Sequence, residues 1–477
     1  MKDSTFPTEI PPLLQAWLDL LEAHRPAFRQ ERTYLRAIGL MMGELFSFAR
    51  HTVTQGLLAL GLTDADWSAW YRLFSRERFD EEQLARCLFR ETLGHVDPSQ
   101  PYVVGMDGVQ VPRSSLKMPG TSWLKAPRTP PFRVGIHRAQ RFLHGAWLTP
   151  VEAGYSRAVP LRFLPIFPEK AVPATVPPCR EWQGGLAYLH WMRQELDAAG
   201  REAQLLFALG DGSFDTLGLW RGLPERTVLA VRTARNRCLY WLPQDRPSGP
   251  GRPPSYGERA PHPADWLHER AGWQKTVLTV RGRELSLRYR VEGPCLRDGL
   301  PERPLFLIVV GGRDRQVGKK KPRRKRTEPA FFLVSAVWDG TGWRLPLPIR
   351  ELLVWLWQRW ELEVAHRDMK SGLGVGEKQC WNPRSAVVSV QWSAWLYAVF
   401  LLAGYRTWGL CGGPRTPARW WPGAQRWSLN TLWRAFRSAV WGKSEFQALW
   451  TRSSDNWLKK EAHLLTLYNA ALAAARI

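Results

Sequence analysis

The order of apolar segments between residues 102 and 233 constrains the fold of this chain most strongly. Short apolar or alternating runs predict strands at 102–111, 132–138 and 144–151. A helix is then predicted at 181–199, followed by one strand ending near Asp211 and another at 227–233. Three strands, a helix and two more strands indicate an α/β domain, in which the connection rules place the first and fourth strands side by side. This is the element order of an RNase H-like fold.

Three acidic residues occupy positions suited to chemistry. Asp107 ends the apolar run 101–107 on the first predicted strand, and Asp211 follows the fourth. Glu363 lies in a predicted helix, 357–370. Singly, such an aspartate is usually a turn residue, and such a glutamate is usually solvated. Together they favour catalysis, because two strand-borne aspartates and a helix-borne glutamate can converge on two divalent cations that activate phosphodiester chemistry.

The helix around Glu363 carries the most specific local pattern. Arg359, Glu363 and Lys370 follow the spacing R-x3-E-x6-K, and His366 shares their helical face. That face could offer one metal ligand flanked by cations able to touch phosphates, namely Arg359, His366 and Lys370. Glu361 points roughly 200° away around the helix.

With these residues the chain resembles the DDE-type insertion-sequence transposases, in the branch whose motif reads Y-x2-R-x3-E-x6-K. Leu356 stands at the tyrosine position. The resemblance extends roughly from residue 102 to 381. It implies a cut-and-paste enzyme with an RNase H-like catalytic domain that is interrupted by a β-rich insertion.

The resemblance also implies cofactors and partners. Two Mg²⁺ ions, or Mn²⁺, are expected on Asp107, Asp211 and Glu363, whose hard oxygen ligands suit Mg²⁺. The expected partners are double-stranded DNA, as terminal inverted repeats and as target, and a second copy of the chain in a homodimer on DNA. Two alternatives stay open: a metal-dependent nuclease that only hydrolyses DNA, and a non-catalytic DNA-binding protein derived from a transposase.

Five regions are expected along the chain. They are a helical N-terminal DNA-binding region (1–95), the first part of the RNase H-like domain (96–233), a β-rich basic insertion (234–330), a second part of that domain with the catalytic helix (331–381), and a helical C-terminal region (382–477). Within the first region, residues 50–61 resemble a short helix-turn-helix element, in which Thr52, Thr54 and Gln55 could face DNA. A plain helical bundle explains that segment equally well.

Charge supports a polyanionic partner. The formal net charge is +24, from 67 Lys and Arg against 43 Asp and Glu. Residues 1–100 carry a net −3, whereas residues 226–330 hold 24 basic and 10 acidic side chains, a net +14. Such clustering raises nucleic-acid affinity through counterion release, although solubility alone is an alternative.

The densest basic run lies between residues 319 and 326. Its charge density and Pro322 predict a mobile, solvent-exposed, phosphate-contacting loop and not a packed strand. Its cationic residues are Lys319, Lys320, Lys321, Arg323, Arg324, Lys325 and Arg326. A second group brackets the strand of Asp107 and could hold the DNA backbone, although surface hairpin charge explains it nearly as well. It comprises Arg113, Lys117, Arg138, Gln140, Arg141 and His144.

The remaining features bear on the cellular compartment. Six scattered cysteines without a C-x-x-C pair predict reduced thiols. The N-terminus lacks the pattern of a signal peptide. Residues 385–405 hold no charge, but a buried core helix is preferred to a membrane span. A prokaryotic cytoplasmic, nucleoid-associated protein is expected. Asp215 and Asp368 are expected to cap or solvate their segments.

Overall fold

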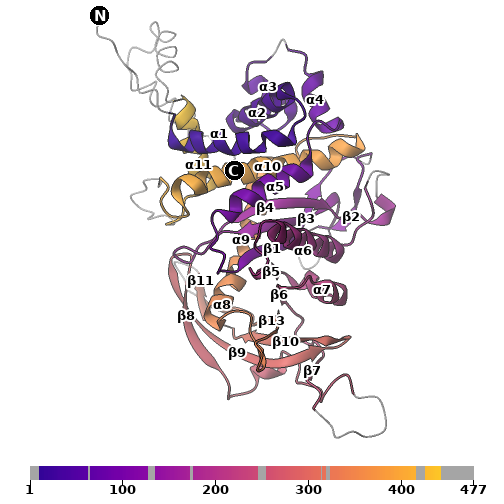
Figure 1. The fold of residues 1–477 in the computed structure, drawn as a ribbon, viewed down its shortest axis with the longest axis vertical. Coiled ribbons are helices and arrows are strands. Elements are labelled where there is room, and N and C mark those ends of the chain that lie inside the picture. The colour runs from indigo at the N-terminus through magenta and orange to yellow at the C-terminus, as the bar shows by residue number, and fades with distance from the viewer. Residues whose placement is uncertain are drawn as a thin grey trace, which may run out of the picture.

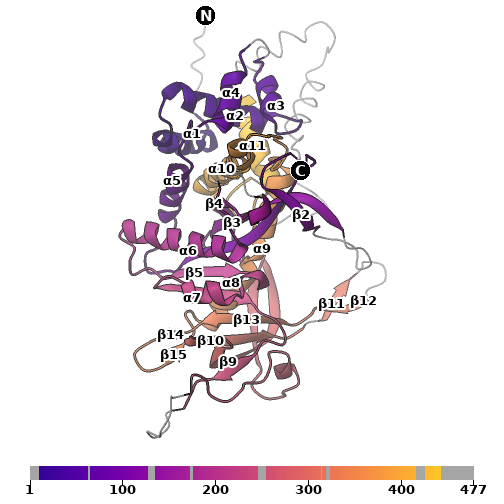
Figure 2. The same ribbon diagram turned by 90° about the vertical axis from the view of Figure 1, so that its right-hand side faces the viewer.

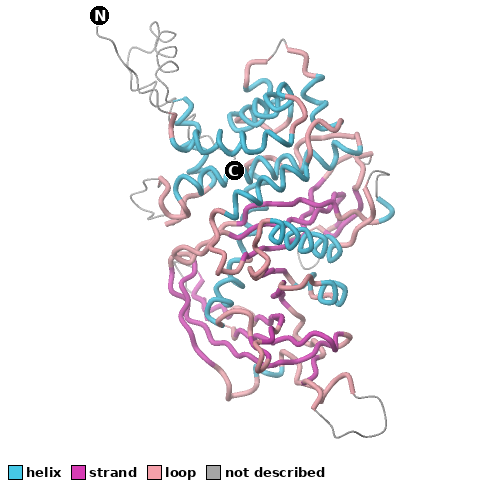
Figure 3. Tube along the Cα trace, viewed as in Figure 1, coloured by secondary structure: helices cyan, strands magenta, loops and turns pink. Residues whose placement is uncertain are grey.

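Helices gather at one end of the molecule, and a large sheet runs through the rest (Figures 1 and 3). The computed structural model describes residues 10–62, 65–115, 117–126, 135–171, 176–244, 254–312, 314–317, 323–414 and 425–441. The helical end contains α1 (Pro12–His24), α2 (Glu31–Phe46), α3 (Val53–Ala59), α4 (Ser68–Ser75), α5 (Glu81–Leu93), α10 (Pro383–Trp408) and α11 (Leu429–Trp441).

Local sequence explains where these helices begin. The Asp80 side chain accepts hydrogen bonds from the backbone N–H groups of Glu82 and Gln83, and so caps α5. Asn382 caps α10 in the same way through Ser385, and Pro383 occupies the first turn, where no N–H group is needed.

Helix α10 confirms the prediction of a core helix. It is the one helix among the described residues that is long and apolar enough to cross a membrane, but 94% of its most apolar window is buried inside the protein. It packs against α1 and against strand β4 (Ala158–Pro165). Helix α10 therefore joins the helical end to the sheet.

The main sheet has eleven strands and a mixed topology. Its order is β2-β3-β1-β5-β6-β13-β10-β9-β7, with β4 paired to β3 and β8 paired to β9. Strands β1, β5 and β6 are parallel, and the other pairs are antiparallel. The bounds are β1 (Tyr102–Pro112), β2 (Thr121–Lys125), β3 (Ile136–Leu148), β5 (Leu206–Gly210), β6 (Thr227–Arg232), β7 (Leu239–Trp241), β8 (Gln274–Val280), β9 (Arg283–Arg297), β10 (Leu300–Val310) and β13 (Ala330–Ser335).

Strands β4, β3, β1, β5 and β6 form the RNase H-like α/β unit that the element order predicts. Helix α6 (Glu181–Ala198) covers one face, where Tyr188 lies against Gly145 of β3. Helix α9 (Trp360–Ser371) covers the other, where Leu362 lies against Gly105 of β1. The sheet therefore presents β1 to a different helix on each face.

One strand prediction was wrong. The segments 132–138 and 144–151 were expected to be two strands, but β3 runs unbroken from Ile136 to Leu148, and residues 132–134 lie outside the described part. The polar residues between them suggested a turn. Gln140 is instead buried, where its side-chain oxygen accepts a hydrogen bond from Arg113. The third strand of the unit is β4.

The β-rich segment extends the same sheet. Strand β13 pairs with β6, and β10 and β9 follow outward from it. Strands β8, β9 and β10 all lie within residues 234–330, the segment predicted to be β-rich. The helices α7 (Leu217–Gly222) and α8 (Ile349–Gln358) and the hairpin β14–β15 (Val337–Trp338, Trp343–Arg344) complete this half.

The basic run is partly a strand. Arg323–Arg326 forms β12, which pairs with β11 (Asp314–Val317) in a separate two-stranded hairpin. This hairpin projects beside the main sheet (Figure 2). The prediction of a loop was therefore wrong for residues 323–326, whose backbone pairs with β11. Lys319, Lys320 and Lys321 lie outside the described residues.

Candidate active site

Asp107 and Asp211 lie level with each other on neighbouring strands. Strands β1 and β5 are parallel, and their register pairs Gly105 with Leu209 at the carboxyl end of β5. Each aspartate comes two residues later on its own strand path. Because side chains two residues apart point to the same face, Asp107 shares the face of Gly105, to which α9 is packed. The predicted adjacency of the two strands is confirmed.

Helix α9 brings Glu363 to this face. A Cβ atom at Gly105 would lie 2.8 Å from Leu362 Cδ1, so glycine allows α9 to approach β1 closely. Glu363 is the next residue along the helix. The predicted continuous helix is two helices, α8 and α9, which meet at Arg359, whose backbone keeps helical angles (φ −50°, ψ −32°).

The three carboxylates interact electrostatically. The Asp107 side chain is 15% exposed, and its pKa is raised to about 7. Burial is the main cause; the Arg359 charge lowers the pKa, and the negative charges of Asp211 and Glu363 raise it further. Asp107 therefore lies within electrostatic range of both other acids. A divalent cation among them would offset this repulsion, and carboxylate oxygens are suitable ligands for it.

Each carboxylate also has a protein partner. Asp211 Oδ1 accepts hydrogen bonds from Ser213 N (2.8 Å) and Oγ (2.6 Å), and Glu363 Oε1 pairs with Arg359 Nη2 at 2.9 Å. Within the described part of the chain, no three His, Cys, Asp or Glu side chains form a ready-made metal-binding group. Metal binding would therefore require small side-chain rearrangements at Asp211 and Glu363.

His366 lies inside the site and not on a cationic surface. Its Nδ1 is 3.7 Å from Asp107 Oδ2, and its Nε2 is 2.7 Å from His144 Nδ1. Burial, followed by the charges of His144, Lys370 and Arg359, lowers the pKa of His366 well below its usual value. His366 was expected to be a cation that contacts phosphates, but its lowered pKa makes it neutral and its side chain is largely enclosed. From this position, the imidazole can hold the Asp107 carboxylate in place.

Sequence reasoning missed the role of His144. This residue is fully buried, it lies opposite Asp107 in the β1–β3 register, and burial lowers its pKa to about 3.

The sequence pattern groups His144 with residues that could hold the DNA backbone. That prediction is wrong for His144, Gln140 and Arg113, because all three are buried. Arg113 donates instead to the carbonyl oxygens of Gly376 (2.7 Å) and Lys378 (3.1 Å).

A pocket of about 600 Å³ adjoins Asp211. Three arginines line it: Arg232 from β6, Arg281 from the β8–β9 turn, and Arg359. Trp360, whose residue surface is 49% exposed, lies at its rim with Trp357 and Phe332. Cations and aromatic rings beside a carboxylate cluster can bind phosphates and bases. Arg232 and Arg281 were not singled out from the sequence, since their convergence depends on the strand order.

Two nearby carboxylates have a structural role. Glu361, facing away from Glu363 as predicted, is 2% exposed and pairs with Arg281 (3.1 Å) and Arg426 (2.5 Å). The expectation of a capping or solvated Asp215 was wrong: its side chain is fully buried and pairs with Arg237 and Arg297. The Asp368 side chain is also largely buried, at 11% exposed, and accepts a hydrogen bond from Arg367.

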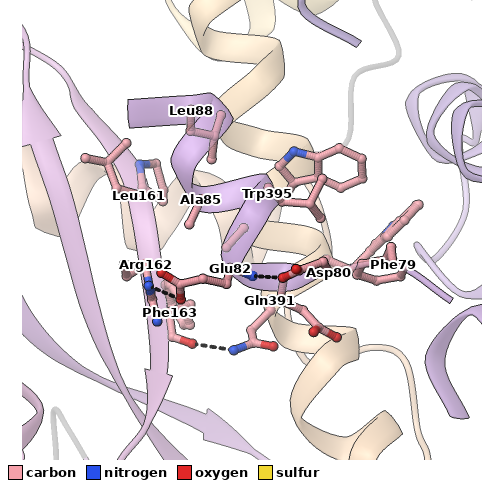
Figure 4. A pocket seen from close by; sticks show the side chains of 15 residues that line it. Phe79, Asp80, Glu82, Ala85, Leu88, Leu161, Arg162, Phe163, Gln391 and Trp395 are labelled. Carbon is pink, nitrogen blue, oxygen red and sulfur yellow. Dashed lines mark hydrogen bonds and ion pairs between the residues drawn. The ribbon is translucent and has the colours of Figure 1, made fainter. Parts of the chain in front are cut away.

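A separate pocket of about 280 Å³ lies between α5, β4 and α10 (Figure 4). Its carboxylate Glu82 is already paired with Arg162 and accepts from Trp191 Nε1. Gln391 donates across it to the Phe163 carbonyl oxygen at 3.0 Å. These contacts connect α5 and α10 to the sheet, so this pocket is a packing feature.

The RNase H-like sheet, with two level aspartates and a helix-borne glutamate, defines a nuclease- or transposase-like class of protein. A sequence model of the family described as DDE superfamily endonuclease matches residues 24–294. This range is more than half of the chain and contains Asp107 and Asp211, while Glu363 lies beyond it. The chain belongs to this DDE superfamily endonuclease family. A search of curated proteins gives no match.

Proposed function

We propose that the protein is a DNA transposase that cleaves and joins transposon ends by metal-dependent phosphodiester transfer. The observation that carries the proposal is the buried Asp107 carboxylate, level with Asp211 and within electrostatic range of Glu363. The family match supports endonuclease chemistry. The R-x3-E-x6-K spacing around Glu363 supports the transposase branch.

Asp107, Asp211 and Glu363 would hold two Mg²⁺ ions, with Mn²⁺ as a substitute. When bound, such ions activate the attacking oxygen and stabilise the leaving one. Arg359, at the pocket wall and paired with Glu363, is positioned to exchange that partner for a substrate phosphate oxygen. Lys370 would contact a neighbouring phosphate. His366, backed by His144, would keep the Asp107 carboxylate in place.

The reaction needs no nucleotide cofactor, because strand transfer breaks one phosphodiester bond and forms another. The attacking group is first water, at the transposon end, and then the freed 3′-hydroxyl, at the target. The proposed partners are double-stranded DNA and a second copy of the chain, in the cytoplasm of a prokaryote. A net charge of +24 supports a polyanionic partner.

Two assays test the function. Mg²⁺-dependent nicking of a terminal-repeat duplex would distinguish an enzyme from a DNA-binding protein, and joining to a second duplex would distinguish a transposase from a nuclease. Inverted repeats and a short target duplication beside the coding sequence would identify the duplex to use. Cleavage without joining would overturn the transposase assignment, and binding without cleavage would overturn the enzymatic one.

A further inference from the structure

Arg141 and Glu181 form an ion pair beside the candidate active site. Arg141 lies on β3, and Glu181 is the first residue of α6. Arg141 Nη2 and Glu181 Oε2 are 2.6 Å apart, and the two side chains are 37% and 14% exposed. The glutamate is therefore largely enclosed, while part of the guanidinium faces solvent.

Glu181 lies on the α6 face of the sheet, next to β1 and within electrostatic range of Asp211. A Cβ atom at Gly108, the residue after Asp107, would lie 1.9 Å from Glu181 Oε1, so Glu181 approaches β1 closely at this glycine. Ser213, whose Oγ donates to Asp211, also lies within hydrogen-bonding reach of Glu181. Burial raises the pKa of Glu181, Arg141 lowers it, and the Asp211 charge raises it again. Glu181 is thus a fourth carboxylate near the site, and Arg141 is its cationic partner.

Arg141 is more exposed than three other members of its group. Of the basic and polar group that brackets β1, Arg113, Gln140 and His144 are buried. Arg141 is partly exposed, and its Nε is a buried atom without a hydrogen-bond partner in the described structure. A guanidinium group binds a carboxylate and a phosphate through the same planar fork of N–H donors. A phosphate could therefore replace Glu181 without requiring a new binding geometry.

We propose that Arg141 is a ligand for a substrate phosphate, and that Glu181 occupies its guanidinium group in the DNA-free protein until the phosphate displaces it. The inference rests on the proposed function, since its ligand is a DNA phosphodiester. Glu181 then weakens DNA binding, because every productive encounter must break the ion pair.

Four variants test the exchange: Glu181→Gln, Arg141→Gln, the double variant, and Glu195→Gln as a control. Glu195 lies on the same helix, has the same 14% exposure, and pairs with Arg86 at 2.8 Å. Affinity for a labelled random-sequence duplex is measured in a metal chelator, so that no cleavage occurs, and thermal unfolding confirms that each variant is folded. Glu181→Gln should bind about fivefold more tightly and Arg141→Gln about fivefold more weakly, as expected for a partly exposed ion pair.

The double variant separates partner exchange from simple removal of charge. If Glu181 acts by occupying Arg141, its substitution should give no gain once Arg141 is absent, and Glu195→Gln should leave affinity unchanged. A gain that persists in the Arg141→Gln background, or no gain from Glu181→Gln alone, would overturn the inference while leaving the proposed function intact. Failure of the wild-type protein to bind DNA would overturn the proposed function, and the inference with it.

Discussion

Two short segments each contain one carboxylate at the site and one inside the fold. In residues 211–215, Asp211 lies at the open end of β5, whereas the Asp215 side chain is fully buried between Arg237 and Arg297. In residues 361–363, Glu363 is 38% exposed beside Arg359, whereas Glu361 is 2% exposed between Arg281 and Arg426. Residue type therefore does not separate the proposed catalytic acids from the structural ones. Within these two segments, each structural acid is enclosed and pairs with two arginines, whereas neither Asp211 nor Glu363 does.

The largest expected effect tests the acids at the site. Asp107→Asn, Asp211→Asn and Glu363→Gln should each reduce metal-dependent DNA cleavage by roughly a thousandfold or more, because each removes charge stabilisation worth several kcal/mol. DNA affinity should stay equal or rise, since each substitution removes a repelling charge. Cleavage of a labelled duplex and its binding in a chelator measure the two effects.

A matched control is Asp339→Asn, which alters a 40% exposed carboxylate paired with Arg344. It should leave cleavage unchanged. Loss of DNA binding in all three site variants would instead assign those acids to folding, and the contrast with Asp215 and Glu361 would disappear.

The second prediction concerns Asp215. Asp215→Asn should lower the free energy of unfolding by about 3–5 kcal/mol, because it leaves two buried arginine contacts without their counter-charge. Trp220 Nε1 (3.0 Å) and Thr233 Oγ1 (2.7 Å) also donate to this carboxylate. Asp211→Asn should change stability by less than about 1 kcal/mol, since asparagine also accepts from Ser213. Urea unfolding of the two variants checks the difference, and equal losses would contradict it.

The third prediction is a substitution that raises the free energy of unfolding, whereas Asp215→Asn lowers it. The folded-state pKa of Asp107, about 7, lies above its ordinary value of 3.8. Between these values the folded protein retains a proton that the unfolded chain releases, so stability falls as pH rises toward 7. In the absence of metal, Asp107→Asn should remove that loss and stabilise the protein above pH 7 by up to about 4 kcal/mol.

Urea unfolding in a chelator, near pH 5 and near pH 8, measures this effect. The wild-type protein should be less stable at the higher pH relative to Asp107→Asn, while Asp215→Asn should be destabilised at both. A variant of Asp107 that is destabilised at both values would show that the carboxylate supports the fold, as Asp215 does.

Sequence alone was sufficient where the information is local or follows from element order. The apolar run before Asp107, the helix at 181–199 and the core helix α10 were predicted nearly to their ends, and the strand order predicted the level placement of Asp107 and Asp211. The R-x3-E-x6-K spacing predicted that Arg359, Glu363 and Lys370 share one helical face, and a catalytic role for Glu363 stays a prediction.

Three predictions failed because the interaction partner of a polar side chain lies far away in the sequence. Gln140 suggested a turn because its hydrogen-bond partner Arg113 lies on another part of the chain, and so β3 was divided in two. Asp215 was expected to cap or solvate its segment, since nothing local shows that Arg297 reaches it from β9. His366 was expected to face DNA, since nothing local shows that β3 places His144 against it. Each error concerns a polar side chain that is buried by a long-range interaction.

The smallest expected effect is a loss of DNA affinity when cations that bind DNA phosphates are neutralised. Replacing Arg323–Arg326 of β12 by glutamine neutralises four of the seven cations in the basic run. Affinity should fall for every DNA sequence, and the slope of log affinity against log salt should flatten by roughly 0.9 for each DNA phosphate that is no longer neutralised. Preference for the terminal repeat over random DNA should change little, because binding to phosphates carries no direct sequence information.

The control is replacement of Arg221 and Arg344 by glutamine, because these exposed arginines are already paired with carboxylates. If the β12 substitutions abolished sequence preference at unchanged non-specific affinity, the hairpin would read bases, and the assignment of recognition to the N-terminal helices would be wrong.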